Sequence, residues 1–217
     1  MAEGKREVKG TGATPEPMQE IEGLVMQMIQ LAIPKVLGVT EDTYRSNLPR
    51  PVWDSDAAAL GFDILVLVEP RVDFWIQLQH ANIANYLSAA LLPDPGVSIN
   101  AGPYWLQVEA GKRHLGRTVK EAEAAFLPGE RGLTALEGVS LVLQRPEILA
   151  TRCLDLPGSR TSSEEVPCLG VWYNRVGLFA RGDNIASPIY GAATCFELER
   201  AERRGKRGDN AETRPIL

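Results

Sequence analysis

The chain has 217 residues, of which 44% are hydrophobic and 24% charged, proportions typical of a globular protein with one domain or a modest pair. The formal net charge of −5 disfavours a protein that binds nucleic acid through a basic surface, so we expect no nucleic-acid partner. The least polar long stretch, residues 57–68, contains Asp63 and is too short to span a membrane. Because residues 1–17 also lack the apolar segment of a secretory signal, we expect a cytoplasmic protein without a membrane partner.

Both ends of the chain are rich in charged and small residues. Residues 1–17 and 197–217 show no apolar periodicity, and segments of this kind seldom bury enough surface to fold. The predicted organisation is a disordered tail over 1–17, a single α+β domain over 18–196, and a charged, mostly disordered tail over 197–217. A subdivision near residue 112 is the alternative, although no Ser- or Gly-rich linker separates the two halves.

The folded part begins with helical patterns. Apolar residues recur at spacings of three and four between residues 18 and 32, which predicts an amphipathic helix. Pro34 interrupts it. Thr40, followed by two acids, is typical of an N-cap and predicts a short second helix that ends before Pro49.

The central part of the chain contains both strand-like and helix-like patterns. Residues 62–68 form a short, β-branched run that is typical of a buried strand. We expect a second strand over 72–78, a helix over 82–92 that stops at a proline-rich turn, and a strand over 104–108. The topology of residues 73–102 is not determined by these patterns.

Two capping boxes follow, in which a Thr hydroxyl and a Glu carboxylate each satisfy a backbone N–H group. Thr118 with Glu121 and Thr134 with Glu137 each predict the start of a helix. Beyond residue 152 the pattern changes to short strands, expected over 153–156, 166–173, 176–181 and 191–196. The predicted fold class is α+β, with N-terminal helices followed by a mostly antiparallel sheet that carries helices on one face.

The sequence contains none of the common signatures for phosphate binding, acyl transfer or zinc hydrolysis. Asp54 and Asp56 could chelate a cation with Asp63 or Glu69, but a polar loop before the strand at 62–68 explains the same residues and is the interpretation we prefer. The two histidines, His80 and His114, anchor no mechanism. We therefore predict no metal and no cofactor, and the catalytic residues, if any exist, are unknown.

Three cysteines occur, at positions 153, 168 and 195, and no two of them form a CxxC pair. All three lie in apolar or strand-like segments, where a free thiol packs as a small hydrophobic group. We interpret them as reduced, buried, structural residues. The four tryptophans are spread along the chain and are interpreted as core residues rather than as a stacking platform.

The loop Gly158-Ser159-Arg160 is the candidate binding site. Glycine permits a tight turn, serine offers a hydroxyl and a backbone N–H, and arginine brings a planar set of donors suited to carboxylate or phosphate. These residues predict an anion-binding loop. In the alternative interpretation, Arg160 pairs with an acid such as Glu164 or Asp155 and holds the loop against the sheet.

A wider pattern includes this loop. Residues 132–138 (GLTALEG) lead through Arg145-Pro146-Glu147 to the GSR loop at 158–160, then to a Pro-Cys-Leu strand at 167–169 and a final Gly-Ala-Ala-Thr-Cys strand at 191–195. This series resembles an uncharacterised family of bacterial proteins with the pattern LT..EG, GSR, P.L and G.A.C, a domain of unknown function. The resemblance implies a shared fold and supplies no activity.

The sequence does not determine what the protein does. The function we expect is that of a binding or interaction module, because no complete set of acid, base and nucleophile is present. The alternative is a small-molecule enzyme that uses Arg160 with a carboxylate or with Cys195. Homo-oligomerisation stays open, and neither the ligand nor the partner follows from the sequence.

Overall fold

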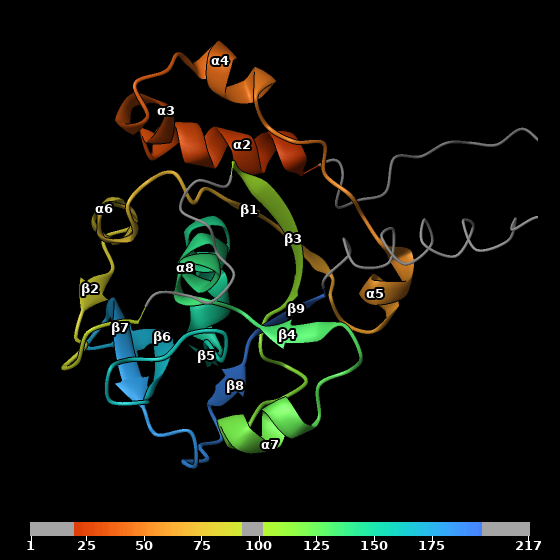
Figure 1. The fold of residues 1–217 in the computed structure, drawn as a ribbon, viewed down its shortest axis with the longest axis vertical. Coiled ribbons are helices and arrows are strands. Elements are labelled where there is room, and N and C mark those ends of the chain that lie inside the picture. The colour runs from red at the N-terminus through yellow and green to blue at the C-terminus, as the bar shows by residue number, and fades with distance from the viewer. Residues whose placement is uncertain (1–19, 93–101, 197–217) are drawn as a thin grey trace, which may run out of the picture.

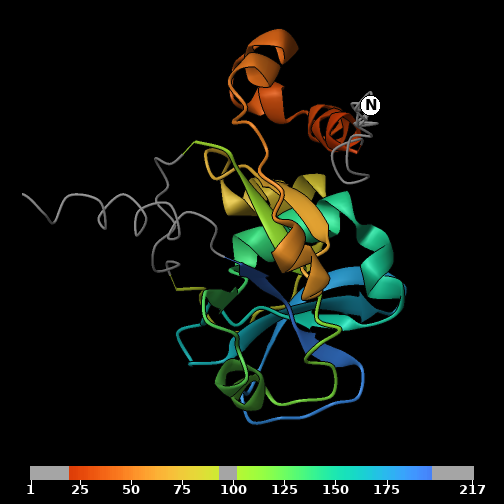
Figure 2. The same cartoon turned by 90° about the vertical axis from the view of Figure 1, so that its right-hand side faces the viewer.

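The computed structural model describes residues 20–92 and 102–196, and the expectations for the two tails lie outside them. The fold is α+β, as predicted, with N-terminal helices followed mainly by strands (Figure 1). The strands form two sheets, and the helix α8, Ala135–Gln144, lies between them. In Figure 2 the N-terminal helices lie at one end of the molecule and the five-stranded sheet lies toward the other.

Four short helices precede the first strand, and their starts follow the local sequence. Thr40 accepts a hydrogen bond from the Thr43 amide as the predicted N-cap, and Pro34 lies in the first turn of a separate helix. The bounds are α2 Ile21–Gln30, α3 Ile33–Val36, α4 Glu41–Ser46 and α5 Ser55–Ala59. None of the described helices has the length and apolar character needed to cross a membrane.

The smaller sheet has four strands in the order β1-β3-β9-β4, and every neighbouring pair is antiparallel. The strands are β1 Ile64–Val68, β3 Tyr104–Glu109, β4 Glu130–Gly132 and β9 Thr194–Phe196. β1 is an edge strand of this sheet, and a buried side chain occupies its outer edge: Gln144 accepts from the Leu67 amide at 2.9 Å and donates to the Leu67 carbonyl at 2.7 Å. At Leu67 the backbone groups of this edge are therefore not free to pair with another strand.

The larger sheet has five strands in the order β2-β7-β6-β5-β8. The pairs β7–β6 and β6–β5 are antiparallel, whereas β2–β7 and β5–β8 are parallel. The strands are β2 Ala84–Asn85, β5 Cys153–Asp155, β6 Val166–Trp172, β7 Arg175–Arg181 and β8 Tyr190–Ala192. The strands expected over 166–173 and 176–181 form a hairpin, β6–β7. Its two turn residues, Tyr173 and Asn174, both have positive φ, which matches the twist of a tight hairpin.

The apolar core surrounds α8. The predicted capping box of Thr134 and Glu137 is present at the start of this helix. Nine of its ten residues are buried, as expected for a helix covered on all sides. Leu154, Leu169 and Leu178 of the larger sheet pack in the same cluster. After α8, the 3-10 helix η1, Pro146–Ala150, leads to β5.

The two sheets meet where β8 passes into β9 at Ala193. The Ala193 amide donates to the Asp155 carbonyl, and the Leu133 amide donates to the Ala193 carbonyl, both at 2.9 Å. A side chain at Gly191 would place its Cβ only 2.0 Å from the Gly111 oxygen. Only glycine allows the two backbones to approach so closely at this corner.

Two sequence predictions in the central region are wrong. Residues 72–78 do not form a strand: Asp73 accepts from the Trp75 and Ile76 amides and begins the helix α6, Phe74–His80. Residues 82–92 do not form a helix, because Asn82 has a φ of 52° that ends α6, and the chain then forms β2. The other predicted capping box, Thr118 with Glu121, begins the helix α7, Val119–Ala124, as expected.

Candidate functional site

The loop Gly158-Ser159-Arg160 lies at the start of α8. The Gly158 amide donates to the Leu133 carbonyl at 2.9 Å, and a Cβ at Gly158 would meet the Leu133 backbone at 2.8 Å. The Ser159 hydroxyl accepts from the Ala135 amide at 2.8 Å, one of the N–H groups that a helix start leaves without a partner. These two residues therefore fix the loop to the helix.

The guanidinium of Arg160 faces acceptors of the protein itself. Its Nη1 donates to the carbonyls of Pro157 at 2.6 Å and Ser159 at 2.9 Å, and its Nη2 donates to Glu123 Oε1 at 2.9 Å. The acid is thus on α7, and it is neither of the two candidates that the sequence suggested. An anion at this loop would have to compete with the Glu123 carboxylate for the same donors.

The segments of the wider sequence pattern meet around this loop and α8. Gly138 faces Leu156 so closely that a Cβ would lie 2.3 Å from a leucine methyl carbon. Cys195 lies opposite Arg131 in the β9–β4 ladder and is completely buried. Close packing accounts for these glycines, and the buried Cys195 thiol is not presented to solvent.

The other candidates from the sequence are separate from this loop. Asp54 accepts from the Asp56 and Ala57 amides as the N-cap of α5. His114 is buried beside Glu130, with 3.3 Å between Nε2 and Oε1, whereas the Nδ1 of His80 lies against the carbonyl of Leu31. Among residues 20–92 and 102–196 no three His, Cys, Asp or Glu side chains are grouped so as to hold a metal ion.

Five acidic side chains are buried in the described part of the chain, namely Glu69, Glu109, Glu130, Glu137 and Asp155. The four glutamates are well provided with donors. Arg71 binds Glu69 through two nitrogens, each at 2.7 Å, and Arg131 binds Glu137 through two nitrogens at 2.7 and 2.6 Å. Such paired contacts offset the loss of hydration on burial.

Backbone amides are donors to the remaining two glutamates, and Glu130 also accepts from a side chain. Glu109 accepts from the amides of Gly111, Lys112 and Arg113. Glu130 accepts from the Leu127 amide at 2.7 Å and from Arg113 at 2.9 Å. Burial alone would raise the pKa of Glu130, but these donors and His114 together hold that pKa at about 2.

Asp155 on β5 differs from the four glutamates. It is 1% exposed, yet neither carboxylate oxygen has a hydrogen-bond partner among the described residues. The nearest cation is Arg181, whose Nε lies 3.6 Å from Oδ1, and the buried Nε and Nη2 of Arg181 also have no hydrogen-bond acceptor there. Burial raises the pKa of Asp155 to about 6, and the charge of Arg181 only partly opposes this shift.

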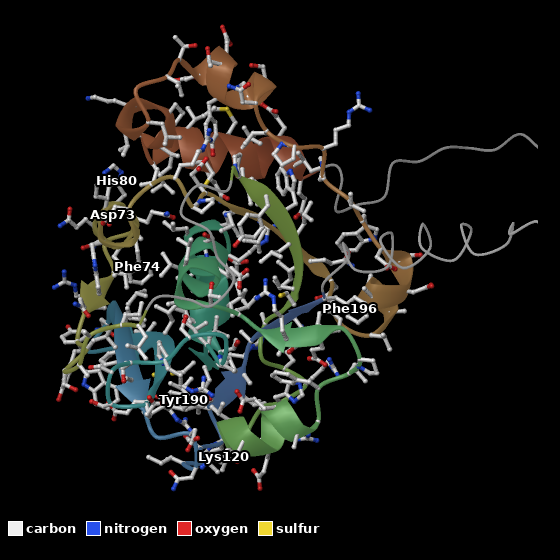
Figure 3. All side chains as sticks on the ribbon, viewed as in Figure 1. Asp73, Phe74, His80, Lys120, Tyr190 and Phe196 are labelled. Atoms are coloured by element: carbon white, nitrogen blue, oxygen red, sulfur yellow. The ribbon has the colours of Figure 1, made fainter. Side chains whose placement is uncertain are left out.

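Register and stacking assemble the surroundings of Asp155 from four strands. Cys168 on β6 lies directly opposite Asp155, and Tyr190 on β8 lies beside Cys153. The guanidinium carbon of Arg181 lies 4.3 Å from the centre of the Tyr190 ring. Figure 3 shows Tyr190, the first residue of β8, in the same part of the molecule as Lys120 of α7, in agreement with the packing of α7 against β8.

The two thiols of this cluster are poor nucleophiles. Burial raises the pKa of Cys168 far above its ordinary value. Burial also raises the pKa of Cys153, although a hydrogen bond with Tyr190 opposes the shift. Because the thiolate is the reactive form, the cluster favours binding over attack by sulfur.

Aromatic side chains continue the same face of the sheet beyond Cys168. Phe179 lies opposite Cys168, and its ring stacks on Tyr86 with 4.9 Å between the centroids. Trp172 lies 6.1 Å from Phe179 and 5.9 Å from Tyr173, again between ring centroids. We call these four residues, Tyr86, Trp172, Tyr173 and Phe179, the aromatic surface.

Neither feature was recognised from the sequence. The sequence offers Asp155 only as a partner for Arg160, and it favours the tryptophans as core residues. The available signal is the period of two along the strands, which places residues 153 and 155 on one face of β5 and residues 168 and 170 on the matching face of β6. This period shows which residues share a face of the sheet, but it does not show which face packs against the core.

The comparisons with known proteins supply no relative: no protein-family model matches the chain, and neither the search of curated proteins nor that of solved structures found a significant match. The resemblance to an uncharacterised bacterial family therefore stays a prediction.

Proposed function

We propose that the protein is an interaction module that binds a partner protein through the aromatic surface. The observation that supports this most directly is the exposure of the β6–β7 hairpin: Tyr173 is 92% exposed and Trp172 is 55% exposed. Large aromatic side chains that remain in water on a folded chain are typical of interaction sites. We thus assign the binding or interaction module expected from the sequence to this surface.

The arrangement of the rings suits protein binding. Phe179 and Tyr86 lean over Gly177, where a Cβ would lie within 2.8 Å of both rings, so their positions are restrained before any partner arrives. Restrained aromatic rings lose little conformational freedom on binding. The tight turn at Tyr173 and Asn174 likewise holds the most exposed ring on a short hairpin.

The charge of the chain favours a protein over nucleic acid as the partner. A net charge of −5 opposes the approach of a polyanion, although single strands can stack on aromatic rings. Arg175, directly opposite Trp172 in the hairpin, is exposed and can pair with an acid at the rim of the partner's site. We therefore expect a partner with an apolar groove and an acidic rim.

The test uses a matched pair of tryptophans. A photo-reactive residue in place of Tyr173 should crosslink a partner, and the purified partner should then bind the full chain with an affinity that Trp172→Ala lowers by about tenfold or more. Trp75→Ala is the control, because Trp75 is 41% exposed on α6, outside the aromatic surface, and should leave the affinity unchanged. Binding that survives Trp172→Ala, or crosslinks to nucleic acid or only to a second copy of the chain, would contradict the proposal.

A further inference from the structure

The buried pair of Asp155 and Arg181 is a second candidate binding site, distinct from the aromatic surface. Four buried glutamates in the described residues are satisfied by paired arginine nitrogens or by several donors. The same chain leaves two carboxylate oxygens of Asp155 and two nitrogens of Arg181 without hydrogen bonds. Buried polar groups usually have hydrogen-bond partners, so these atoms call for a third participant, a bound molecule that supplies the missing hydrogen bonds.

The charge of the site restricts what that participant can be. Asp155 and Arg181 carry opposite charges and lie 3.6 Å apart, Oδ1 to Nε, so together they are neutral. An anion or a cation added here would leave one charge unbalanced in a buried place. The participant should therefore carry no net charge.

The hydrogen-bonding capacity of the site restricts it further. The oxygens of Asp155 can only accept when the group is ionised, and the nitrogens of Arg181 can only donate. The participant must then present a donor and an acceptor side by side. A carboxamide does so within one planar group, with its NH₂ toward Asp155 and its oxygen toward Arg181.

The neighbours of the pair agree with a small group of this kind. Cys168, 2% exposed, lies beside Asp155 in the ladder, and a thiol is a weakly polar neighbour that does not compete strongly for hydrogen bonds. Cys153 and Tyr190 are only partly buried, so this edge of the site is in contact with solvent. The Tyr190 ring stacks on the Arg181 guanidinium and does not belong to the apolar core cluster around α8.

We propose that Asp155 and Arg181 form a binding site for the uncharged carboxamide group of a small molecule. The ligand enters past Tyr190, donates to the Asp155 carboxylate and accepts from Nε and Nη2 of Arg181. This site is independent of the proposed partner protein, since the aromatic surface takes no part in these contacts.

The test compares three small probes of nearly equal size on the full chain, followed through its backbone amide NMR signals. The titrations are run at mildly alkaline pH, where Asp155, with a pKa raised by burial to about 6, is ionised. Propionamide should shift the amides of Asp155, Cys168 and Arg181 in a saturable manner. Propionate and propylammonium should each bind at least about tenfold more weakly, and equal binding of either ion would overturn the proposal.

A fourth probe tests the donor contact without any mutation. N,N-dimethylpropionamide keeps the acceptor but lacks both N–H donors, so its affinity should fall by about tenfold or more relative to propionamide. Unchanged affinity would show that Asp155 accepts nothing from the ligand. The absence of saturable shifts with every probe would also overturn the proposal, and would leave water as the group between Asp155 and Arg181.

Variants complete the test. Asp155→Asn keeps the shape but turns one acceptor into a donor, and it should abolish the propionamide shifts. Asp183→Asn is the control, because Asp183 is an acid of the following loop that pairs with Lys120 at 3.2 Å. Trp172→Ala should keep the propionamide affinity, so that failure of this site and failure of the proposed protein interaction can be told apart.

Discussion

The two faces of the five-stranded sheet bury side chains of different kinds. The inner face places Leu154, Leu169 and Leu178 against α8, and all three are completely buried. The outer face buries Asp155 and Cys168, and it carries exposed aromatic rings toward the β6–β7 hairpin. The inner face needs only apolar packing to be stable, whereas the outer face holds polar groups whose hydrogen bonds are incomplete. The first face explains the fold, and the second is where binding is proposed.

The largest expected effect separates the two faces on a single strand. Leu169→Ala on the inner face of β6 should lower the free energy of unfolding by about 2–5 kcal/mol, because it removes buried carbons and leaves a cavity. Trp172→Ala, three residues along the same strand but 55% exposed, should change it by less than about 1 kcal/mol. Urea denaturation of both variants measures the difference. Similar losses would mean that the outer face also supports the fold.

A second prediction uses the opposite pKa shifts of two buried acids. The pKa of Asp155 is raised to about 6 by burial, so between about pH 4 and pH 6 the folded protein keeps a proton that the unfolded chain releases. The contribution of Asp155 to stability is therefore greatest at low pH, and about 3 kcal/mol is lost as the pH rises through that window. Asp155→Asn should remove this pH dependence.

Glu130 should show the reverse dependence and serves as the matched case. Burial would raise its pKa, but its donors lower the pKa to about 2, so its contribution is present above about pH 4 and is lost as the pH falls toward 2. Glu130→Gln should remove that loss. Denaturation curves of wild type and both variants across this pH range are the measurement. Parallel pH profiles for the two variants would show that Asp155 is as well satisfied as Glu130.

The sequence predicted the elements whose signals are local. Thr118 and Thr134 begin their helices as expected, since a capping box satisfies backbone groups within one turn. The prediction failed at 72–78, where the apolar residues of a short amphipathic helix were interpreted as a strand. Asp73, the N-cap of α6, is the sequence signal that distinguishes a helix from a strand here.

The outer-face cluster was beyond the reach of sequence patterns. Asp155 and Arg181 lie on strands separated by β6, and no spacing in the chain indicates that they approach to 3.6 Å. The sequence suggests Asp155 only as a partner of Arg160, whereas in the structure Arg160 pairs with Glu123. Which acid meets which arginine depends on the register of the sheet, and that register is set by tertiary packing rather than by local preference.

The smallest expected effect concerns Arg160, whose donors, unlike Nε and Nη2 of Arg181, have acceptors among the described residues. Arg160 donates to two carbonyls and to Glu123, and because its side chain is 27% exposed solvent weakens these contacts. Arg160→Lys keeps the charge but loses the planar set of donors, so it should lower the free energy of unfolding by about 1 kcal/mol.

If the loop at Gly158 and Ser159 binds anions, phosphate should raise the melting temperature of the wild type more than that of Arg160→Lys. Glu123→Gln should enlarge the phosphate effect, because the competing carboxylate charge is gone, and the absence of any phosphate dependence in both the wild type and Glu123→Gln would leave Arg160 as a brace between the loop and α7.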